Sequence, residues 1–216
     1  MTLQGPLQAW GGHTLETYRP TESFPTRSGL TGLLAAALGI DRRNEDSLRA
    51  LDSSYSYAVR EDRFHEQKGA ILPLPPSRKM TDYHTVQNVR TVGGKPKETE
   101  VTYREYLEDT KFTVALRQAG SSAYPLERLA KALTAPHFML FLGRKSCPIC
   151  CPPFKGFVKA ESLEDALRQC RPQNGLVYSE EPPSTVQSNL TRLRDVPLGG
   201  RSFAERNVYF YNMEVE

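Results

Sequence analysis

Two polar stretches combine hydroxyl, guanidinium or ammonium groups in a way that suits an anion such as a phosphate. Thr26, Arg27 and Ser28 precede a long Leu/Ala run, and they are predicted to open a helix whose first turn offers free backbone N–H groups. Arg144, Lys145 and Ser146 follow the apolar stretch FMLFLG as a second polar cluster. The alternatives are a simple helix cap at 26–28 and a solvated loop at 144–146.

The segment from Arg78 to Arg104 is a third candidate, because it carries six basic and three acidic residues. The formal net charge of the whole chain is +3, so the positive excess resides in this segment. Arg90 and Arg104 are candidate RNA contacts, and Tyr83 and His84 could stack on unpaired bases. The segment therefore favours a nucleic-acid partner over a small molecule.

Catalysis needs a nucleophile, an acid/base pair or a metal cage. The four histidines are scattered and form no H-E-x-x-H pattern. Tyr83 and His84, with Lys79 or Lys95, could cleave RNA at a 2′-hydroxyl without a metal. We expect a binding protein that is not an enzyme, and keep a metal-independent endoribonuclease as the alternative. A protein scaffold without RNA contact is a third hypothesis.

Four cysteines are present, and Cys147 and Cys150 have the C-x-x-C spacing of half a zinc site. No later pair completes a tetrahedral set, so we expect no metal and no cofactor. No apolar run approaches the roughly 18 residues of a membrane span, and no leader is evident at the N-terminus. We therefore expect a cytoplasmic protein without a membrane partner.

The expected fold class is α+β with the ferredoxin-like order βαββαβ. Strands are predicted just before Gly5 and over 55–62, 111–117 and 154–160; helices are predicted from 26 to about 39, over 45–52 and over 125–134. About fifty residues separate the second and third strands, and the basic segment 78–104 is expected there as a long arm. A helix over 162–170 and strands near 175–179 and 207–215 predict a small C-terminal β-rich lobe. The expected domains are 1–160 and 161–216.

The stretch GPLQAWGG, residues 5–12, contains the only tryptophan of the chain. Its glycines can turn the chain tightly after the first strand and let the backbone approach a partner closely. Gln8 and Trp10 are therefore candidate RNA contacts at the same edge of the sheet. The alternative for Trp10 is an ordinary core position.

Several stretches occur together in the order of a known family. They are GPLQAWG (5–11), RPTESFPTRSGLTGLLAAALGI (19–40), DYHTV (82–86), YREYLEDTKFTVAL (103–116) and LGRKSCP (142–148). On these residues the sequence strongly resembles the CasD family of type I-E CRISPR Cascade complexes, whose members hold the 5′ end of the guide RNA. The match covers most of residues 5–148 and is thin beyond residue 160.

The resemblance implies an RNA-recognition-motif-like core with a protruding thumb, which would be the arm at 78–104, a long basic β-hairpin. It implies binding of the crRNA 5′ handle, capping of the CasC backbone filament, contact with the large CasA subunit and the rest of Cascade, and contact with target DNA through the complex. A relative in type I-C systems is itself a metal-independent processing nuclease, which keeps the catalytic alternative open. The sequence departs from the family in its short first strand, because a family member usually has several more apolar residues before Gly5.

The expected RNA path runs across the helix start and the 144–146 loop, with the thumb at the junction of handle and spacer. Arg27, Arg104, Arg144 and Lys145 would neutralise phosphates. Tyr83, His84 and Trp10 would stack on splayed bases or enclose them.

Overall fold

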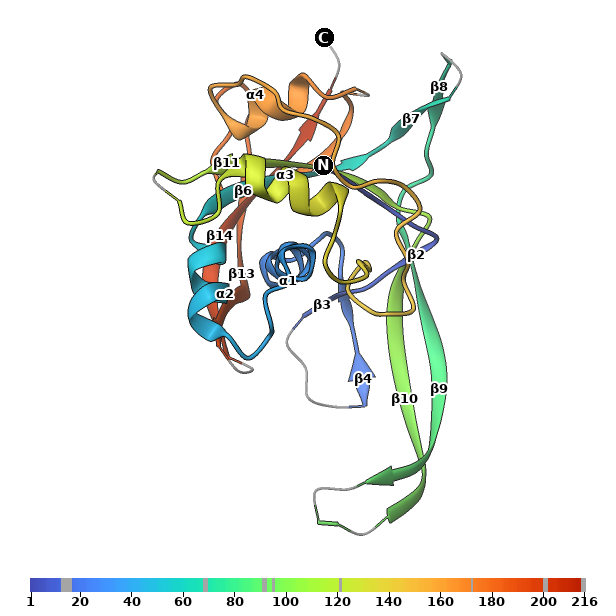
Figure 1. Ribbon diagram of the computed structural model, residues 1–216. Helices are drawn as coiled ribbons and strands as arrows, with labels where there is room; N and C mark the ends of the chain where they lie inside the picture. The colour runs from blue at the N-terminus through green and yellow to red at the C-terminus, as the bar shows by residue number, and fades with distance from the viewer. Residues whose placement is uncertain are drawn as a thin grey trace.

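A six-stranded antiparallel sheet is the centre of the computed structural model (Figure 1). The structure describes residues 1–12, 17–67, 70–90, 93–94, 96–120, 122–171, 173–199 and 202–214. Across the sheet the strands are β1 (Thr2–Gln4), β11 (Lys111–Gln118), β6 (Tyr55–Asp62), β12 (Gly175–Ser179), β14 (Ser202–Met213) and β13 (Asn189–Gly199). The protein is therefore a mixed α+β structure, as the sequence predicts.

Helices cover both faces of this sheet. Successive residues of a strand point to opposite faces, so neighbouring residues of one strand belong to different cores. On β6, Tyr57 and Val59 belong to the larger core with α1 (Arg27–Leu38) and α3 (Leu126–Thr134). Ala58, between them, belongs to a smaller core with α4 (Leu163–Arg168). The remaining helix, α2 (Glu45–Asp52), packs against α1 and β13. Each described helix is too short or too polar to cross a membrane.

The helix and strand signals in the first two thirds of the chain are mostly confirmed. Strands occupy 55–62 and 111–118, and helices occupy 27–38, 45–52 and 126–134. Thr26 caps α1, since its side chain accepts from the Gly29 N–H group, and Gly39 ends the helix with a φ of 76°. Local chemistry was sufficient for these elements because caps and periodicity mark their ends.

The predicted strand over 154–160 is wrong: all seven residues are described, and none belongs to a strand. The segment reaches the edge of β1, where the Thr2 N–H group donates to the Pro153 carbonyl at 2.8 Å. Pro152 and Pro153 have no N–H groups to donate to a ladder, and Gly156 has a φ of 148°. The apolar alternation of FKGFV was therefore not enough to form a strand.

The C-terminal strands do not form a separate lobe. β12 pairs directly with β6, and β14 and β13 extend the same sheet outwards. Residue 160, the expected domain boundary, consequently does not separate two sheets. The predicted strand 207–215 is part of β14, and β13 was not predicted.

A long antiparallel hairpin occupies the expected position of the arm. It consists of β9 (Arg78–Arg90) and β10 (Pro96–Glu108), and it projects well beyond the central sheet (Figure 1). β10 also pairs with β2 (Leu7–Gln8) and, in parallel, with β4 (Tyr18–Arg19). Two small sheets complete the fold: β3 (Trp10–Gly11) with β5 (Thr21–Glu22), and β7 (Phe64–Gln67) with β8 (Ala70–Pro73).

Buried charge joins α4 to the sheet. The Arg60 and Asp62 side chains are completely buried, with 2.7 Å between Arg60 Nε and Asp62 Oδ1. Arg60 also donates to the carbonyl oxygens of Leu167 and Cys170, at the end of α4. A buried guanidinium needs partners of this kind, so this polar stretch of β6 is part of the interior.

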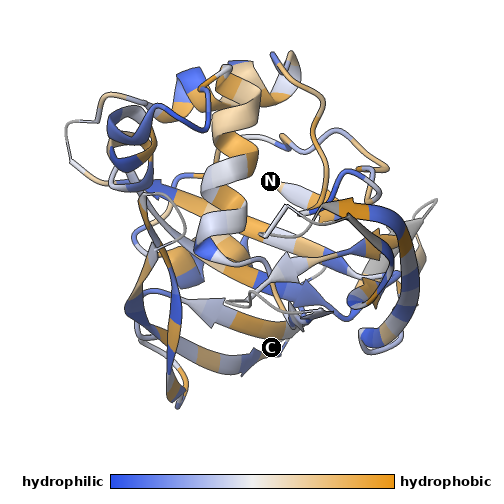
Figure 2. Ribbon diagram, turned by 90° about the horizontal axis from the view of Figure 1, so that it is seen from below, coloured by the Kyte–Doolittle hydropathy of each residue, from blue (hydrophilic) through white to orange (hydrophobic). Residues whose placement is uncertain are grey.

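Hydropathy colouring shows the resulting layers, with orange and pale residues of α1 above alternating orange and blue positions on the strands (Figure 2). The alternation is the expected pattern for a sheet with a packed face.

The turn at Gly143 generates a stability prediction. Gly143 has a φ of 85°, and a Cβ atom there would lie 1.8 Å from the Ala9 carbonyl oxygen. Gly143→Ala should lower the free energy of unfolding by roughly 3 kcal/mol or more, because it adds a backbone clash to left-handed strain. Gly120→Ala is the matched control, since its φ is 53° and no atom lies within 4 Å of its Cβ position. Urea denaturation should separate the two variants, and equal destabilisation would contradict the prediction.

Candidate nucleic-acid interface

The hairpin has two faces of different chemistry, fixed by the register of its strands. Tyr103 pairs with Tyr83 on β9 and with Tyr18 on β4. These three residues, which we call the tyrosine row, therefore lie on one face. The next residue, Arg104, pairs with Asp82 on β9 and with Arg19 on β4, on the opposite face.

Three arginines gather on that opposite face, and we call Arg19, Arg104 and Arg144 the basic face. Arg19 and Arg104 are register partners on adjacent strands. The Arg144 guanidinium lies 4.6 Å from the centre of the Tyr106 ring, which shares this side of β10. No carboxylate of the described chain lies within ion-pair distance of Arg19 or Arg104. Like charges directly opposite destabilise a sheet, and a bound anion would relieve the repulsion between Arg19 and Arg104. Asp82, the register partner of Arg104 on β9, lies on the same face beside His84.

Arg144 also holds the loop 143–147 against the base of the hairpin. Its Nη1 atom donates to the Glu105 carbonyl at 3.0 Å, and its Nη2 atom donates to the Arg19 carbonyl at 3.2 Å. Lys145 and Ser146 follow as exposed residues. The structure thus brings the predicted contacts Arg104 and Arg144 together, with Lys145 and Ser146 next to them along the chain.

His84 lies on the same side of β9 as Asp82, and these two side chains form an ion pair when His84 is protonated. Tyr83, between them in sequence, points to the other face. The general acid/base pair that the sequence suggested is therefore divided between the two faces of the hairpin.

Two N–H groups in the first turn of α1 already have partners within the protein. The Arg27 N–H group donates to Asp195 Oδ2 at 2.7 Å, and the Gly29 N–H group donates to the side chain of Thr26. Thr26 is buried, and Ser28, half-buried, lies with its Oγ atom 3.5 Å from Thr26 Oγ1. Strand β13 thus supplies an anion at this helix start, and Thr26 is the helix cap that the sequence analysis gave as the alternative. The phosphate contact of Ser28 stays a prediction.

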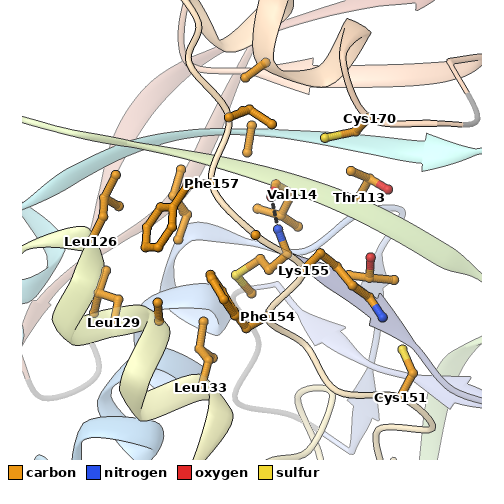
Figure 3. A pocket seen from close by; sticks show the side chains of 18 of the residues that line it. Thr113, Val114, Leu126, Leu129, Leu133, Cys151, Phe154, Lys155, Phe157 and Cys170 are labelled. Carbon is orange, nitrogen blue, oxygen red and sulfur yellow. Dashed lines mark hydrogen bonds between the residues drawn. The ribbon is translucent and has the colours of Figure 1, made fainter.

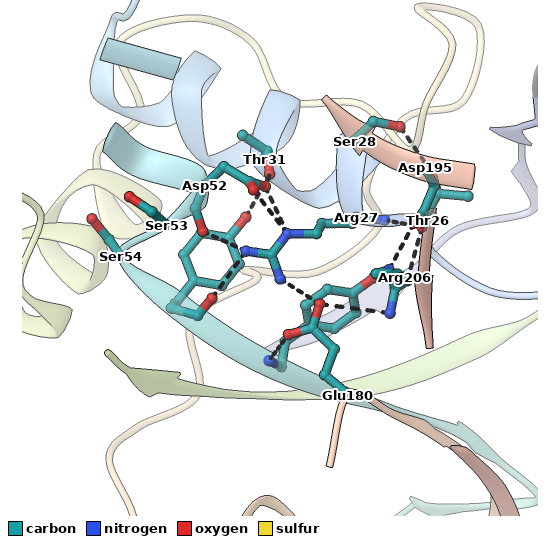
Figure 4. Close-up of polar contacts among 12 residues, drawn as sticks. Thr26, Arg27, Ser28, Thr31, Asp52, Ser53, Ser54, Glu180, Asp195 and Arg206 are labelled. Atoms are coloured by element: carbon teal, nitrogen blue, oxygen red, sulfur yellow. Dashed lines mark hydrogen bonds and ion pairs between the residues drawn. The ribbon is translucent and has the colours of Figure 1, made fainter. Parts of the chain in front are cut away.

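Arg27 is also not at the surface, which corrects its predicted role (Figure 4). Its Nε atom donates to both carboxylate oxygens of Asp52, at 2.8 and 2.9 Å. Its Nη1 atom pairs with Glu180, and its Nη2 atom donates to the Tyr55 carbonyl at 3.2 Å. All three nitrogens of this guanidinium donate to acceptors within the protein. It therefore does not offer its donors to an RNA phosphate.

The same network includes a second arginine from the C-terminal hairpin. Arg206 Nε lies 2.7 Å from Asp195 Oδ1, and its Nη1 atom lies 3.6 Å from Glu180. Burial alone would lower the pKa of Arg27, but the carboxylates of Glu180 and Asp52 outweigh it and raise that pKa. We call Arg27, Asp52, Glu180, Asp195 and Arg206 the buried ion network.

Comparison with known proteins identifies the family. A family model described as CRISPR-associated protein (Cas_Cas5) matches residues 1–210. The chain belongs to the Cas5 family of CRISPR-associated proteins. The resemblance on which the sequence analysis relied is thereby confirmed.

Individual relatives agree with this assignment. The chain is 41% identical to the CRISPR system Cascade subunit CasD of Escherichia coli (strain K12), over 97% of this chain and 93% of that protein. It matches a chain of a structure described as a CRISPR RNA-guided surveillance complex with a TM-score of 0.75 and 28% identity, over 100% of this chain and 89% of the other. A crystal structure of a Cas protein matches with a TM-score of 0.64 and 30% identity, over 98% and 92% of the two chains.

Gln8 and Trp10 are core residues of this Cas5 protein, so their predicted exposure to RNA is wrong. Gln8 is 0% exposed and donates to the Thr110 carbonyl at 2.6 Å; Trp10 is 1% exposed and donates from its indole to Gln8 Oε1 at 3.0 Å. A Cβ atom on Gly29 would lie 2.8 Å from the indole. The glycine near the start of α1 therefore makes room for the single tryptophan.

The side chains of two predicted residues near the hairpin tip, Arg90 and Lys95, are not among those that the structure describes. Lys95 lies outside the described residues, and Arg90 ends β9 without a described side chain. Within its full length, 78–108, the hairpin carries six basic and five acidic residues, because Glu105 and Glu108 extend the predicted segment. The hairpin itself is therefore nearly neutral, and two of the three arginines of the basic face, Arg19 and Arg144, come from outside it.

Sequence reasoning missed Tyr18 and Arg19. They precede the first long helix and form a strand of only two residues, so no periodicity marked them. The dipeptide Tyr-Arg occurs at both 18–19 and 103–104, and the parallel pairing of the two strands places tyrosine opposite tyrosine and arginine opposite arginine.

The protein also has a cavity of about 510 Å³. None of the predicted RNA contacts lines it. Figure 3 shows side chains of α3 facing Phe154 and Phe157 across this cavity. The Met1 amine donates to the Val114 carbonyl at 2.6 Å. Its lining includes Leu126, Leu129, Leu133, Phe154 and Phe157. Burial lowers the pKa of the Met1 amine to about 6.

Cys147 is buried in the main core, while Cys150 is exposed. Burial raises the pKa of the Cys147 thiol, which disfavours the thiolate form that binds metal. Within the described part of the chain, no cluster of three or more His, Cys, Asp or Glu residues is arranged to hold an ion.

The buried ion network generates the second prediction. Arg27→Ala leaves Asp52 and Glu180 without their main partner, so the free energy of unfolding should fall by about 3–5 kcal/mol. Arg43→Ala is the matched control, since Arg43 pairs with Asp41 at the surface and exposed pairs contribute little. Thermal and urea denaturation of both variants tests this, and an unchanged midpoint for Arg27→Ala would contradict the network's importance.

Proposed function

We propose that this Cas5 protein is a noncatalytic RNA-binding subunit of a type I-E CRISPR Cascade complex, and that it binds the 5′ handle of the crRNA. The observation that carries the proposal is the basic face. Arg19 and Arg104 are opposite each other in register, and Arg144 is fixed beside them by bonds to Arg19 and Glu105. A polyanion that crosses this face would neutralise all three charges at once.

The family and its relatives supply the biological setting. The CasD protein of Escherichia coli is described as a Cascade subunit, so we infer crRNA, the CasC backbone filament, the CasA subunit and the rest of Cascade as partners, with target DNA contacted through the complex. Capping of the backbone filament would place this chain at one end of it. We infer that this antiviral complex acts in the cytoplasm.

The finer architecture fits this role. The strand order β1, β11, β6 is that of the first three strands of an RNA-recognition-motif-like sheet, with α1 following the first strand. The long hairpin is inserted between the second and third of these strands, β6 and β11. We propose that this hairpin is the thumb.

Absence of catalysis is part of the proposal, and the division of Tyr83 and His84 between two faces supports it. A general acid and base must both reach the scissile phosphate, and adjacent residues of a strand do not. Lys79 is on the side of Tyr83, but its Nζ atom donates to the Thr21 carbonyl at 2.7 Å.

Phosphate binding by the basic face generates the third prediction. Arg19→Ala and Arg104→Ala should each weaken binding of single-stranded handle RNA, and each should reduce the steepness of the salt dependence by about 0.7 per lost contact. Fluorescence anisotropy over a salt series measures both effects. Arg194→Ala is the control, because Arg194 pairs with Glu205 on the C-terminal hairpin. Unchanged affinity in both basic-face variants would overturn the proposed path.

The fourth prediction concerns catalysis and is tested by incubating the protein with repeat RNA in EDTA. The wild-type protein should leave the RNA intact, because its candidate acid and base do not converge. A discrete cleavage product that disappears in His84→Ala would instead establish the metal-independent endoribonuclease.

A further inference from the structure

We propose that the tyrosine row (Tyr18, Tyr83 and Tyr103) is a stacking surface for unpaired bases of single-stranded RNA. This inference rests on the proposed function and extends it, because it assigns base contacts to the face of the hairpin opposite the basic face. The ligand class is an extended RNA strand with splayed bases.

Exposure of the row is the first observation. Tyr83 is 59% exposed, Tyr18 is 45% exposed and Tyr103 is 43% exposed. Single exposed apolar side chains are normal, whereas a contiguous group on a projecting element indicates a binding surface. Strand register, rather than chance, aligns these three rings across β4, β10 and β9.

The base of the row is fixed in position before any ligand arrives. The Tyr18 hydroxyl donates to Glu105 Oε1 at 2.5 Å, and the Thr21 N–H group donates to Glu105 Oε2 at 3.0 Å. Lys79 Nζ lies 3.8 Å from the same carboxylate. Partial burial would raise the pKa of Glu105, but the bonds from Tyr18 and Thr21 lower it overall. The carboxylate is thus ionised and paired, so it orients Tyr18 while Lys79 offsets its repulsion of phosphates.

Ring geometry decides how a base could bind. The Tyr83 and Tyr103 centroids are 5.6 Å apart at 75°, and those of Tyr18 and Tyr103 are 6.4 Å apart at 36°. A base inserted between two rings needs them parallel and separated by about 7 Å, twice the roughly 3.4 Å spacing of stacked bases. The rings do not meet that requirement. Bases would therefore stack on the outward ring surfaces, as splayed single nucleotides do.

The surroundings of the row favour RNA over a protein partner. The register places Thr81 and Thr85 on this face of β9 with Tyr83, and Gln87 and Thr99 further towards the tip. These side chains are exposed, while Val101, the register partner of Thr85 on this face, is half-buried. Hydroxyl and amide groups can bond to base edges, whereas an apolar protein surface would be met by aliphatic side chains. Stacking on an aromatic ring also accepts any of the four bases, because every base has a flat face, so the tyrosine row would bind RNA of different sequences.

The test uses single-stranded RNA oligonucleotides with one 2-aminopurine at successive positions, and the full-length protein. With wild-type protein, binding should change the fluorescence at one or more positions as the base leaves its neighbours and stacks on a ring. Tyr83→Ala and Tyr103→Ala should abolish the change at the affected position and weaken binding by roughly 5- to 150-fold. Tyr83→Phe and Tyr103→Phe should retain both, because the ring is kept.

Phe157→Ala is the matched control, since Phe157 is also 59% exposed but lies far along the chain from the hairpin and lines the cavity. It should leave fluorescence and affinity unchanged. RNA binding by wild-type protein that is insensitive to both alanine variants would overturn the stacking role and leave the proposed function standing. Alanine variants that keep RNA affinity but lose assembly with the backbone subunit would show a protein contact instead. Failure of the wild-type protein to bind RNA would overturn both.

Discussion

The Arg27 guanidinium, held between Asp52 and Glu180, is the interaction on which the arrangement of this protein depends. These three residues come from the start of α1, the end of α2 and the end of β12. Arg206 and Asp195 extend the network to β14 and β13. A buried guanidinium is tolerated only where its donors are matched. The network therefore requires the C-terminal strands to close over the helix start and fixes that part of the chain to the central sheet.

A consequence of this closure is that the start of α1 is covered by the protein itself. The anion at the first turn of α1 is Asp195, a residue of the protein itself. The available cations lie instead where the Arg144 loop meets the base of the hairpin. The hairpin then combines two kinds of surface on one thin element: arginines that suit phosphates and tyrosines that suit bases. A two-residue strand, β4, completes both by placing Tyr18 beside Tyr103 and Arg19 beside Arg104.

Prediction from the sequence succeeded where the signal was local and failed where it depended on distant partners. The Thr26 cap and Gly39 stop of α1, the apolar periodicity of α3 and the alternation of β6 and β11 are properties of neighbouring residues. The segment 154–160 has similar alternation, but two prolines and the absence of a ladder partner decided its structure. Arg27, at a predicted helix start, and Arg144, in a predicted loop, were both expected to bind phosphate, and only the carboxylates brought near Arg27 separate their roles.

The sequence by itself determined the family, the α+β class, the main helices and the existence of a long arm between two strands of the sheet. These follow from short-range propensity and from motifs whose order along the chain is visible. Only the tertiary structure decided which charges are buried, which aromatic residues are exposed and which face of the hairpin each occupies. The physical reason is that burial and cross-strand register depend on residues far apart in the sequence, such as Arg27 and Glu180 or Tyr18 and Tyr103. Their meeting is a property of the folded chain.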